Sequence, residues 1–260
     1  MKILFIGDVV GSIGCSFLKK NIWSVRKSEE IDLVIANGEN SADGNGITPQ
    51  SADSLYEAGV DVISTGNHVY RRKEIYEYLN SKNNIIRPAN FMPGNPGRGM
   101  CIYKTGKGDV AVINLCGLVY MESNDCPFRT ADKLIEEASL KTKNIIIDFH
   151  AEATSEKRAL AEYVCGRVSA VIGTHTHVPT ADEKILAGKT GFITDVGMTG
   201  PHEGILGVDK EIIIEKLRLG MPAKFELAKG SVQFNAVFLD IDEATGKTIS
   251  IKRIFKVFEI

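Results

Sequence analysis

Three features are missing from this sequence of 260 residues: paired cysteines, a long apolar run and an excess of charge of one sign. The five cysteines are dispersed and include no C-x-x-C pair, which argues against a disulfide framework and against a thiolate zinc site. The first apolar run turns polar at Asp8, too early for a signal peptide, and no window approaches the ~18 apolar residues of a membrane helix. We therefore expect a cytoplasmic protein in a reducing compartment, without a membrane contact.

Charge is nearly balanced, with 31 Lys and Arg residues against 33 Asp and Glu residues and a formal net charge of -2. Such a chain has no overall basic field that could hold a long nucleic acid by counterion release, so bulk nucleic-acid binding is not expected. Hydrophobic residues make up 43% of the sequence, enough at this length to bury one large core. We expect residues 1–260 to form a single domain.

Short apolar runs alternate with helical patterns through most of the chain, which is typical of an α/β fold. Strands are expected at residues 2–6, 31–36, 60–64, 100–104, 110–115, 145–149, 169–172 and 192–196. Helices are expected at residues 15–26, 49–58, 71–80, 130–140 and 155–165. Residues 90–99, rich in proline and glycine, predict a loop, and the alternating pattern from Ser231 onward predicts antiparallel strands.

The glycines after the first strand are spaced G-x-x-x-G-x-x-G from Gly7 to Gly14. This spacing is neither the dinucleotide fingerprint nor a P-loop, so a phosphate cradle is not favoured. Asp8 has a better use as a carboxylate at the carboxyl end of a strand, where open α/β sheets place their ligands.

Two histidines in the segment Gly173-Thr174-His175-Thr176-His177 follow a short buried strand. His175 and His177 should leave the strand on the same side of the backbone, within reach of one polar site. On its own the pair could equally be a polar surface loop, since imidazole serves often in that role. His68 and His150 also lie just past apolar runs, which leaves His202 as the one histidine outside the pattern.

Five predicted strand ends therefore carry side chains that can bind a metal, namely Asp8, Glu39 with Asn40, Asn67 with His68, His150, and His175 with His177. This set of nitrogen and oxygen donors without a thiolate suits Zn, Mn or Fe. Its size exceeds the three or four protein ligands of one catalytic zinc, so two ions joined by a bridging carboxylate fit better. Two divalent ions, two carboxylates and a hydroxide sum to about +1, which matches an anionic phosphate ester.

Asp8, Gly66-Asn67-His68, His150 and Thr174-His175-Thr176-His177, in this order and at these intervals, resemble the motifs of the calcineurin-like metallophosphoesterases. Three positions depart from that pattern. Val10 stands where the family has a histidine, Glu39 where it usually has an aspartate, and Thr174 where it usually has a glycine. These departures, together with the segments 7–11, 148–152 and 194–201, resemble the YmdB-like branch of bacterial phosphodiesterases over nearly the whole chain.

The resemblance implies a four-layer α/β sandwich, with two mainly mixed β-sheets flanked by α-helices. It implies one metal ion held by Asp8, Glu39, Asn40 and His177 and a second held by Glu39, Asn67, His150 and His175, with Glu39 as the bridge. Iron is the first expectation for both ions, and manganese or zinc are alternatives. His68 is left as the general acid or as a phosphate contact.

The resemblance also implies a phosphodiesterase that hydrolyses cyclic nucleotides such as 2′,3′-cyclic AMP by attack of a metal-bridging hydroxide. Roles in biofilm, motility and RNA-turnover regulation come with it, and we expect a homo-oligomer. The same site could instead serve a phosphomonoesterase or a nuclease, because metal ligands leave the rest of the substrate undetermined. A regulatory protein that binds metal and acts through protein or RNA contacts is the third possibility.

Two further segments carry open interpretations. Arg71, Arg72 and Lys73 are expected to be a solvated face, but three cations in the first turn of a helix oppose its dipole, and a phosphate-bearing ligand nearby would explain them. Asp195 lies at a strand end near the predicted site, where a hydrogen bond that stabilises a loop is favoured over metal ligation.

Overall fold

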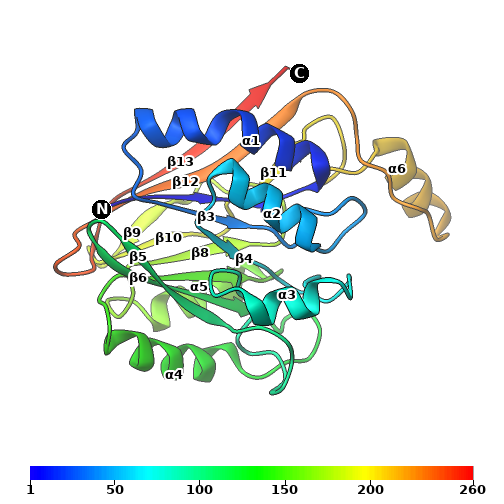
Figure 1. Cartoon of the computed structure of the whole chain (residues 1–260). Helices are drawn as coiled ribbons and strands as arrows, with labels where there is room; N and C mark the ends of the chain where they lie inside the picture. Colours follow the sequence, from blue (N-terminus) through cyan, green and yellow to red (C-terminus); the bar gives the residue numbers. More distant parts are fainter. Residues whose placement is uncertain (260) are drawn as a thin grey trace.

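The computed structural model describes residues 1–259 and arranges them in four layers, with helices outside two central sheets (Figure 1). Within that range the helices are α1 (Gly11–Ser28), α2 (Pro49–Ala58), α3 (Ile75–Ser81), α4 (Pro127–Ser139), α5 (Thr154–Tyr163) and α6 (Lys210–Leu219). Helices α1 and α2 cover one face of the sandwich, and α4 and α5 cover the other. None of these helices has both the length and the apolar character that crossing a bilayer requires.

The first sheet has the strand order β2-β11-β12-β1-β3-β4, and β13 also pairs with β12. Its strands are β1 (Lys2–Ile6), β2 (Asp8–Val9), β3 (Leu33–Asn37), β4 (Val62–Ser64), β11 (Met198–Pro201), β12 (Val232–Ile241) and β13 (Thr248–Phe258). The strands β1, β3 and β4 run parallel, whereas β12 is antiparallel to both β1 and β13. The antiparallel strands predicted from Ser231 onward are thus confirmed.

The second sheet has the order β5-β6-β7-β8-β10-β9. Its strands are β5 (Met100–Thr105), β6 (Gly108–Cys116), β7 (Ile145–His150), β8 (Ala170–Thr174), β9 (Lys184–Leu186) and β10 (Thr190–Ile193). The four strands β6, β7, β8 and β10 are parallel, and the edge strands β5 and β9 are antiparallel to their neighbours. Both sheets are therefore mixed, as predicted.

Buried apolar side chains fill the three interfaces between the layers. Leu18 and Leu55 pack helices α1 and α2 onto the first sheet, Phe5 and Val112 lie between the two sheets, and Leu160 packs α5 onto the second sheet. Sheets covered on both faces need apolar side chains on both sides of each strand, which explains the continuous apolar runs in the sequence. The predicted four-layer α/β sandwich is confirmed.

Local signals placed some boundaries correctly. Helix α2 begins after Thr48, whose side chain accepts a hydrogen bond from the Ser51 amide, and it ends at Gly59 with a left-handed φ of 101°. Helix α1 begins earlier than predicted, at Gly11, because the second half of the glycine-rich segment is helical. A Cβ on Gly14 would lie 2.6 Å from the Thr199 carbonyl oxygen, so glycine lets this helix pack closely on β11.

Several predicted boundaries were wrong by two or more residues, and three of them lie close to the predicted site. Strand β4 begins at Val62 rather than at residue 60, β10 ends at Ile193 rather than at residue 196, and α3 begins at Ile75 rather than at residue 71. Arg71 and Arg72 precede α3, and Arg72 donates to the carbonyl oxygens of Asp43 and Asn45. Strands β2, β9 and β11 and helix α6 were not predicted.

Candidate metal centre

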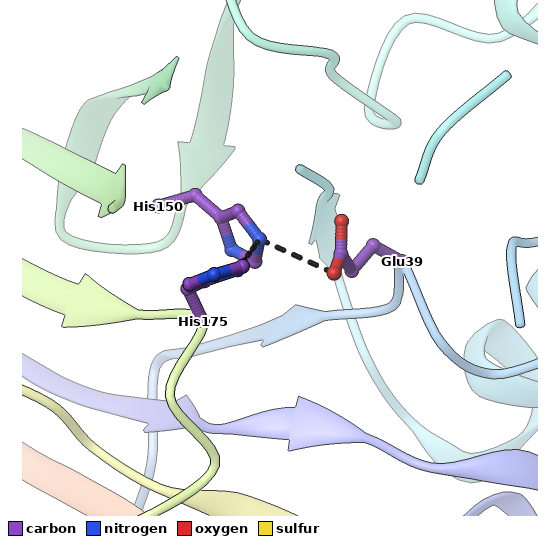
Figure 2. Close-up of side chains that lie close together, drawn as sticks. All are labelled: Glu39, His150 and His175. Atoms are coloured by element: carbon purple, nitrogen blue, oxygen red, sulfur yellow. Dashed lines mark hydrogen bonds and ion pairs between the residues drawn. The ribbon is translucent and has the colours of Figure 1, made fainter. Parts of the chain in front are cut away.

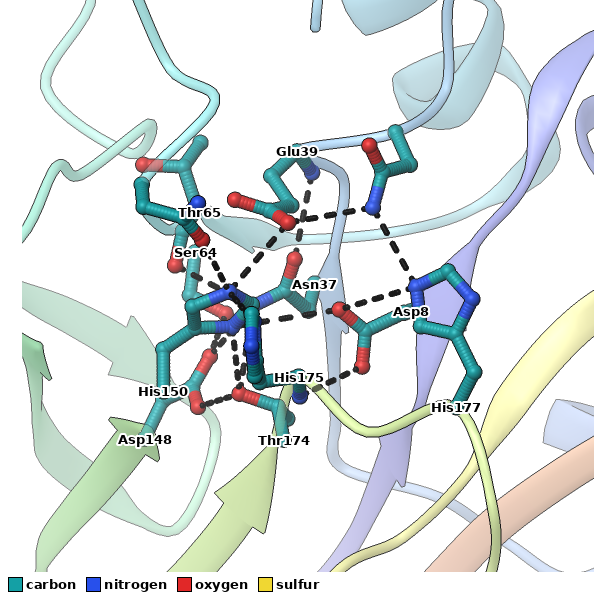
Figure 3. Close-up of polar contacts among 12 residues, drawn as sticks. Asp8, Asn37, Glu39, Ser64, Thr65, Asp148, His150, Thr174, His175 and His177 are labelled. Atoms are coloured by element: carbon teal, nitrogen blue, oxygen red, sulfur yellow. Dashed lines mark hydrogen bonds and ion pairs between the residues drawn. The ribbon is translucent and has the colours of Figure 1, made fainter. Parts of the chain in front are cut away.

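Glu39 lies at the centre of a polar cluster where strands from both sheets end (Figure 3). It follows β3, and two histidines of the cluster come from the second sheet: His150 ends β7 and His175 follows β8. One ligand atom from each of these three residues lies within 4.8 Å of the other two, a spacing that could hold a metal ion (Figure 2). Oε1 of Glu39 is 3.2 Å from Nε2 of His150, which is 3.1 Å from Nδ1 of His175.

A second group of predicted ligands meets Glu39 from its other side. Asn40 Nδ2 lies 3.0 Å from Oε1 of Glu39 and 3.2 Å from Nε2 of His177. That histidine nitrogen is 4.0 Å from Oδ1 of Asp8, and the other carboxylate oxygen of Asp8 accepts from the His175 amide at 3.2 Å. The structure therefore brings Asp8, Asn40 and His177 together.

Asn67 and His68 complete the predicted set from the segment after β4. Oδ1 of Asn67 lies 3.1 Å from Nε2 of His150, on the side of the cluster that His175 also occupies. The His68 amide donates to Oε2 of Glu39 at 3.0 Å, and Nδ1 of its ring is 3.0 Å from Oδ1 of Asn40. The His68 side chain is 27% exposed, whereas Asp8 and His150 are fully buried, so His68 lies at the solvent side. All eight predicted site residues lie in this cluster.

The orientation of His150 is fixed by residues that the sequence analysis did not assign to the site. The Thr174 hydroxyl donates to Asp148 at 2.7 Å and lies 2.9 Å from Nδ1 of His150. Because its hydrogen goes to Asp148, this hydroxyl accepts from Nδ1–H of His150 and leaves Nε2 directed at Glu39 and Asn67. Asn37 also donates to Asp148, at 3.0 Å. A charged residue within the apolar run 145–149 was the available signal for Asp148.

The loop that carries both histidines has an unusual backbone, with φ of 104° at His175 and 65° at His177. Left-handed conformations are costly for such residues unless surrounding contacts hold them. Asp195 supplies such contacts: it accepts from the Thr176 amide at 3.0 Å and pairs with Lys157 at 2.6 Å. This ion pair is buried. The loop-stabilising hydrogen bond predicted for Asp195 is thus confirmed, whereas nothing in the sequence indicated Lys157.

Burial and charge shift the pKa values of the cluster in opposite directions. Burial raises the pKa of Asp8, while nearby imidazoles offset only part of the effect. Burial also opposes charge on Glu39, but His150 and His68 outweigh it and hold the pKa of Glu39 well below its usual range. Burial works against protonation of His150 as well, yet Glu39 and Asp8 raise its pKa to about 9. Burial and the charge of His150 lower the pKa of His175 to about 3.

Two local features fit a bound cation. Oδ1 of Asp8 is buried and has no hydrogen-bond partner among residues 1–259, a costly state for a carboxylate unless a cation lies beside it. A Cβ on Gly66 would come within 2.3 Å of Glu39 and His150, so glycine is required where this backbone passes the cluster. The donors are imidazole, carboxylate and amide groups, the set that suits Zn, Mn or Fe.

The basic segment before α3 was thought to need a phosphate-bearing ligand, but in the structure its arginines contact other parts of the protein. Arg72 is engaged with the loop at Asp43 and Asn45, at 2.7 and 3.1 Å, and Arg71 lies 3.8 Å from the exposed Glu122. Because α3 begins only at Ile75, these cations do not occupy its first turn, and the supposed conflict with the helix dipole does not arise.

The four-layer sandwich and the cluster at its strand ends together define a phosphoesterase scaffold of the calcineurin-like fold. A chain of a 5′-nucleotidase candidate from Staphylococcus aureus, in complex with alpha-ketoglutarate, shares this fold at a TM-score of 0.62 and 16% identity, covering 98% of this chain and 54% of its own. The chain belongs to the family of YmdB-like proteins, whose family model matches residues 4–254.

More similar relatives match over nearly their whole length. A 2′,3′-cyclic-nucleotide 2′-phosphodiesterase from Bacillus subtilis is 48% identical over 98% of this chain and 96% of its own. The crystal structure of a hypothetical protein from Thermus thermophilus has a TM-score of 0.93 and 41% identity, covering 100% of this chain and 99% of that one. The structure of a novel phosphatase from Mycoplasma pneumoniae has a TM-score of 0.93 and 34% identity, covering 100% and 94%.

Proposed function

We propose that this protein is a metal-dependent phosphodiesterase that hydrolyses nucleoside 2′,3′-cyclic phosphates such as 2′,3′-cyclic AMP. The observation that carries the proposal is the position of Glu39, which contacts Asn40 on one side and His150 on the other, each with further nitrogen or oxygen donors beside it. A bridging carboxylate between two cations requires such a position. The name of the Bacillus subtilis relative supports the substrate class.

One ion would be held by Asp8, Glu39, Asn40 and His177, and the other by Glu39, Asn67, His150 and His175. When bound, such ions act as Lewis acids and lower the pKa of a coordinated water. Asn40 would need its amide turned by half a rotation to present oxygen to the cation, an exchange of Oδ1 and Nδ2 that costs little space. Iron is our first choice for the ions, and manganese and zinc accept the same donors.

The chain's own residues prepare the site for this chemistry. Thr174, which donates to Asp148, accepts the hydrogen bond from Nδ1–H of His150 and so keeps the ring hydrogen on Nδ1. Nε2 of His150 then faces Glu39 with its lone pair available for a cation. Lys157 and Asp195 hold the loop of His175 and His177 in its left-handed conformation. His68, at the solvent side, is positioned to give a proton to the leaving oxygen of the substrate.

A phosphomonoesterase acting at the same site is the second candidate, and the name of the Mycoplasma pneumoniae phosphatase favours it. A direct comparison separates the two: hydrolysis of bis(p-nitrophenyl) phosphate should exceed that of p-nitrophenyl phosphate, and chelation should abolish it until Mn or Fe is restored. A preference for the monoester would instead support the phosphomonoesterase. No turnover by metal-replete protein would support a regulatory protein that acts through protein or RNA contacts.

We place the protein in the cytoplasm, where its five free cysteines would remain reduced. The single domain over residues 1–260 and the homo-oligomer stay predictions, as do the regulatory consequences of hydrolysis. Limited proteolysis and sedimentation of the purified chain would test the first two.

A further inference from the structure

A cavity of about 570 Å³ opens above the metal cluster, within the range of pockets that hold small ligands. Its floor includes Glu39, Asn40, His68, His175 and His177. A second part of the lining, here called the wall, is apolar and consists of side chains from one stretch of the chain between β11 and β12, including Ile205, Leu206, Val208, Ile213, Leu217 and Phe225. One cavity thus joins a polar floor to an apolar wall.

The wall is built from helix α6 and from the segments immediately before and after it. This helix stands apart from the four layers in Figure 1, and none of its residues is buried. Leu217 is 75% exposed and Phe225 is 37% exposed, so both side chains offer apolar surface to the cavity. The ammonium of Lys216 lies 4.4 Å from the centre of the Phe225 ring, a cation–π contact that restrains the ring.

The wall is tied directly to the floor. Nδ1 of His177 lies 3.2 Å from the carbonyl oxygen of Leu206, while Nε2 of the same ring faces Asn40. A ligand whose phosphate occupies the floor would therefore have its remaining part against the wall. The wall suits a planar group with apolar faces, and Asn45, Glu152 and Glu226 in the same cavity could meet polar edges.

We propose that this wall is the nucleobase subsite, in which Phe225 and Leu217 contact the faces of the base of a nucleoside 2′,3′-cyclic phosphate. The proposal rests on the proposed function, because it assumes that the phosphate of the same molecule lies at the floor. It assigns the base contacts to the segment between β11 and β12, which contains none of the predicted metal ligands.

The test compares 2′,3′-cyclic AMP with the 2′,3′-cyclic phosphate of 1-deoxyribose, which has the same leaving group but no base. Stacking of a base on an aromatic side chain contributes about 5- to 150-fold to binding. We expect Phe225→Ala to lower kcat/KM for the nucleotide by about 10-fold and to lower it far less for the abasic ester. Leu217→Ser should have a smaller effect with the same selectivity.

Leu219→Ser is the matched control, because Leu219 is also exposed on α6, at 51%, but lies outside this cavity. It should leave both rates unchanged. Equal losses on the two substrates in Phe225→Ala, or no loss on either, would overturn the base subsite. A change of oligomeric state in Leu217→Ser without any change in base selectivity would mean that a second copy of the chain covers the wall, and would also overturn it.

Binding measurements keep this inference separate from the proposed function. If the metal-loaded wild-type protein hydrolyses neither cyclic ester, the proposed function fails. Calorimetric titration with both intact esters then tests whether the wall binds the base. Weaker binding of 2′,3′-cyclic AMP to Phe225→Ala, with unchanged binding of the abasic ester, supports the subsite. Equal binding of the nucleotide to both proteins contradicts it.

Discussion

The floor and the apolar wall of the cavity are built in opposite ways. The floor consists of residues at strand ends of both sheets, and Glu39, together with Asp8 and His150 of the same metal cluster, has almost no solvent exposure. The wall comes from α6, which has no buried residue, and from the segments on either side of it. The packed sheets can hold donor atoms as accurately as metal binding requires. Residues of a loosely packed helix can be substituted without disturbing the core. The two proposals thus assign chemistry and substrate choice to different parts of the fold.

The largest loss is expected at the centre of the floor. Glu39→Gln removes the negative charge of the proposed bridge while keeping its shape, so metal occupancy and turnover should both fall, with activity reduced by about 10⁴-fold or more. Elemental analysis and steady-state kinetics would measure both effects. Glu122→Gln is the control, because Glu122 is 71% exposed and pairs only weakly with Arg71. Two ions per chain and full turnover in Glu39→Gln would remove the bridging assignment.

His68 belongs to the floor and lies at its solvent side. We expect His68→Ala to keep both metals and a normal fold and to lose about 10²- to 10⁴-fold of its activity on 2′,3′-cyclic AMP, whose leaving group is a poor anion. The loss on bis(p-nitrophenyl) phosphate should be distinctly smaller, because an aryl oxide leaves without a proton.

The contrast between the two substrates is the informative result for His68. Equal losses with both metals retained would mean that His68 chiefly binds the phosphate. Loss of a metal would add it to the ligands and would require one of the assigned residues to leave that set.

The ion pair beneath the histidine loop should matter mainly for stability. Lys157→Met leaves Asp195 as an unpaired buried charge, which typically costs about 3–5 kcal/mol of the free energy of unfolding. Adding Asp195→Asn should restore much of this loss, since no buried charge then remains. The double variant should still bind metal more weakly, because asparagine has one acceptor oxygen where Asp195 uses two to hold the Thr176 and Gly197 amides beside the left-handed loop.

Urea unfolding of the metal-free proteins and metal titration would separate the two effects of this pair. Lys141→Met, at an exposed position, is the control for loss of a lysine. A single variant Lys157→Met as stable as the wild type would show that the pair contributes nothing. Metal affinity in the double variant equal to that of the wild type would show that Asp195 does not position the loop.

The sequence predicted most of the floor because parallel strands bring their carboxyl ends to one edge, so polar residues after apolar runs had to meet there. It predicted α2 because Thr48 and Gly59 are local signals that act within one turn. It placed the start of α3 too early because the contacts of Arg72 with the loop at Asp43 form only in the folded chain.

Other parts depend on partners far apart in the sequence or on weaker patterns. Lys157 and Asp195 are separated by 38 positions, and no local pattern joins them. Helix α6 was missed although Asp209 caps its start and Gly220 ends it with a left-handed φ of 68°. Ile213, Ile214 and Leu217 do have the three- and four-residue spacing of a helix face, but none of them is buried in a core, so the pattern did not connect this helix to the site. The wall was therefore the least predictable part of the site.

Metal removal and restoration test the central claim, that the buried floor is a metal centre for phosphodiester hydrolysis, most directly. Protein purified without added metal should contain close to two ions per chain, lose turnover of 2′,3′-cyclic AMP when these are chelated, and regain it when Mn or Fe is returned. Oδ1 of Asp8, buried without a partner in residues 1–259, is the atom that most needs such a cation. Hydrolysis that persists at full rate in metal-free protein would contradict the account.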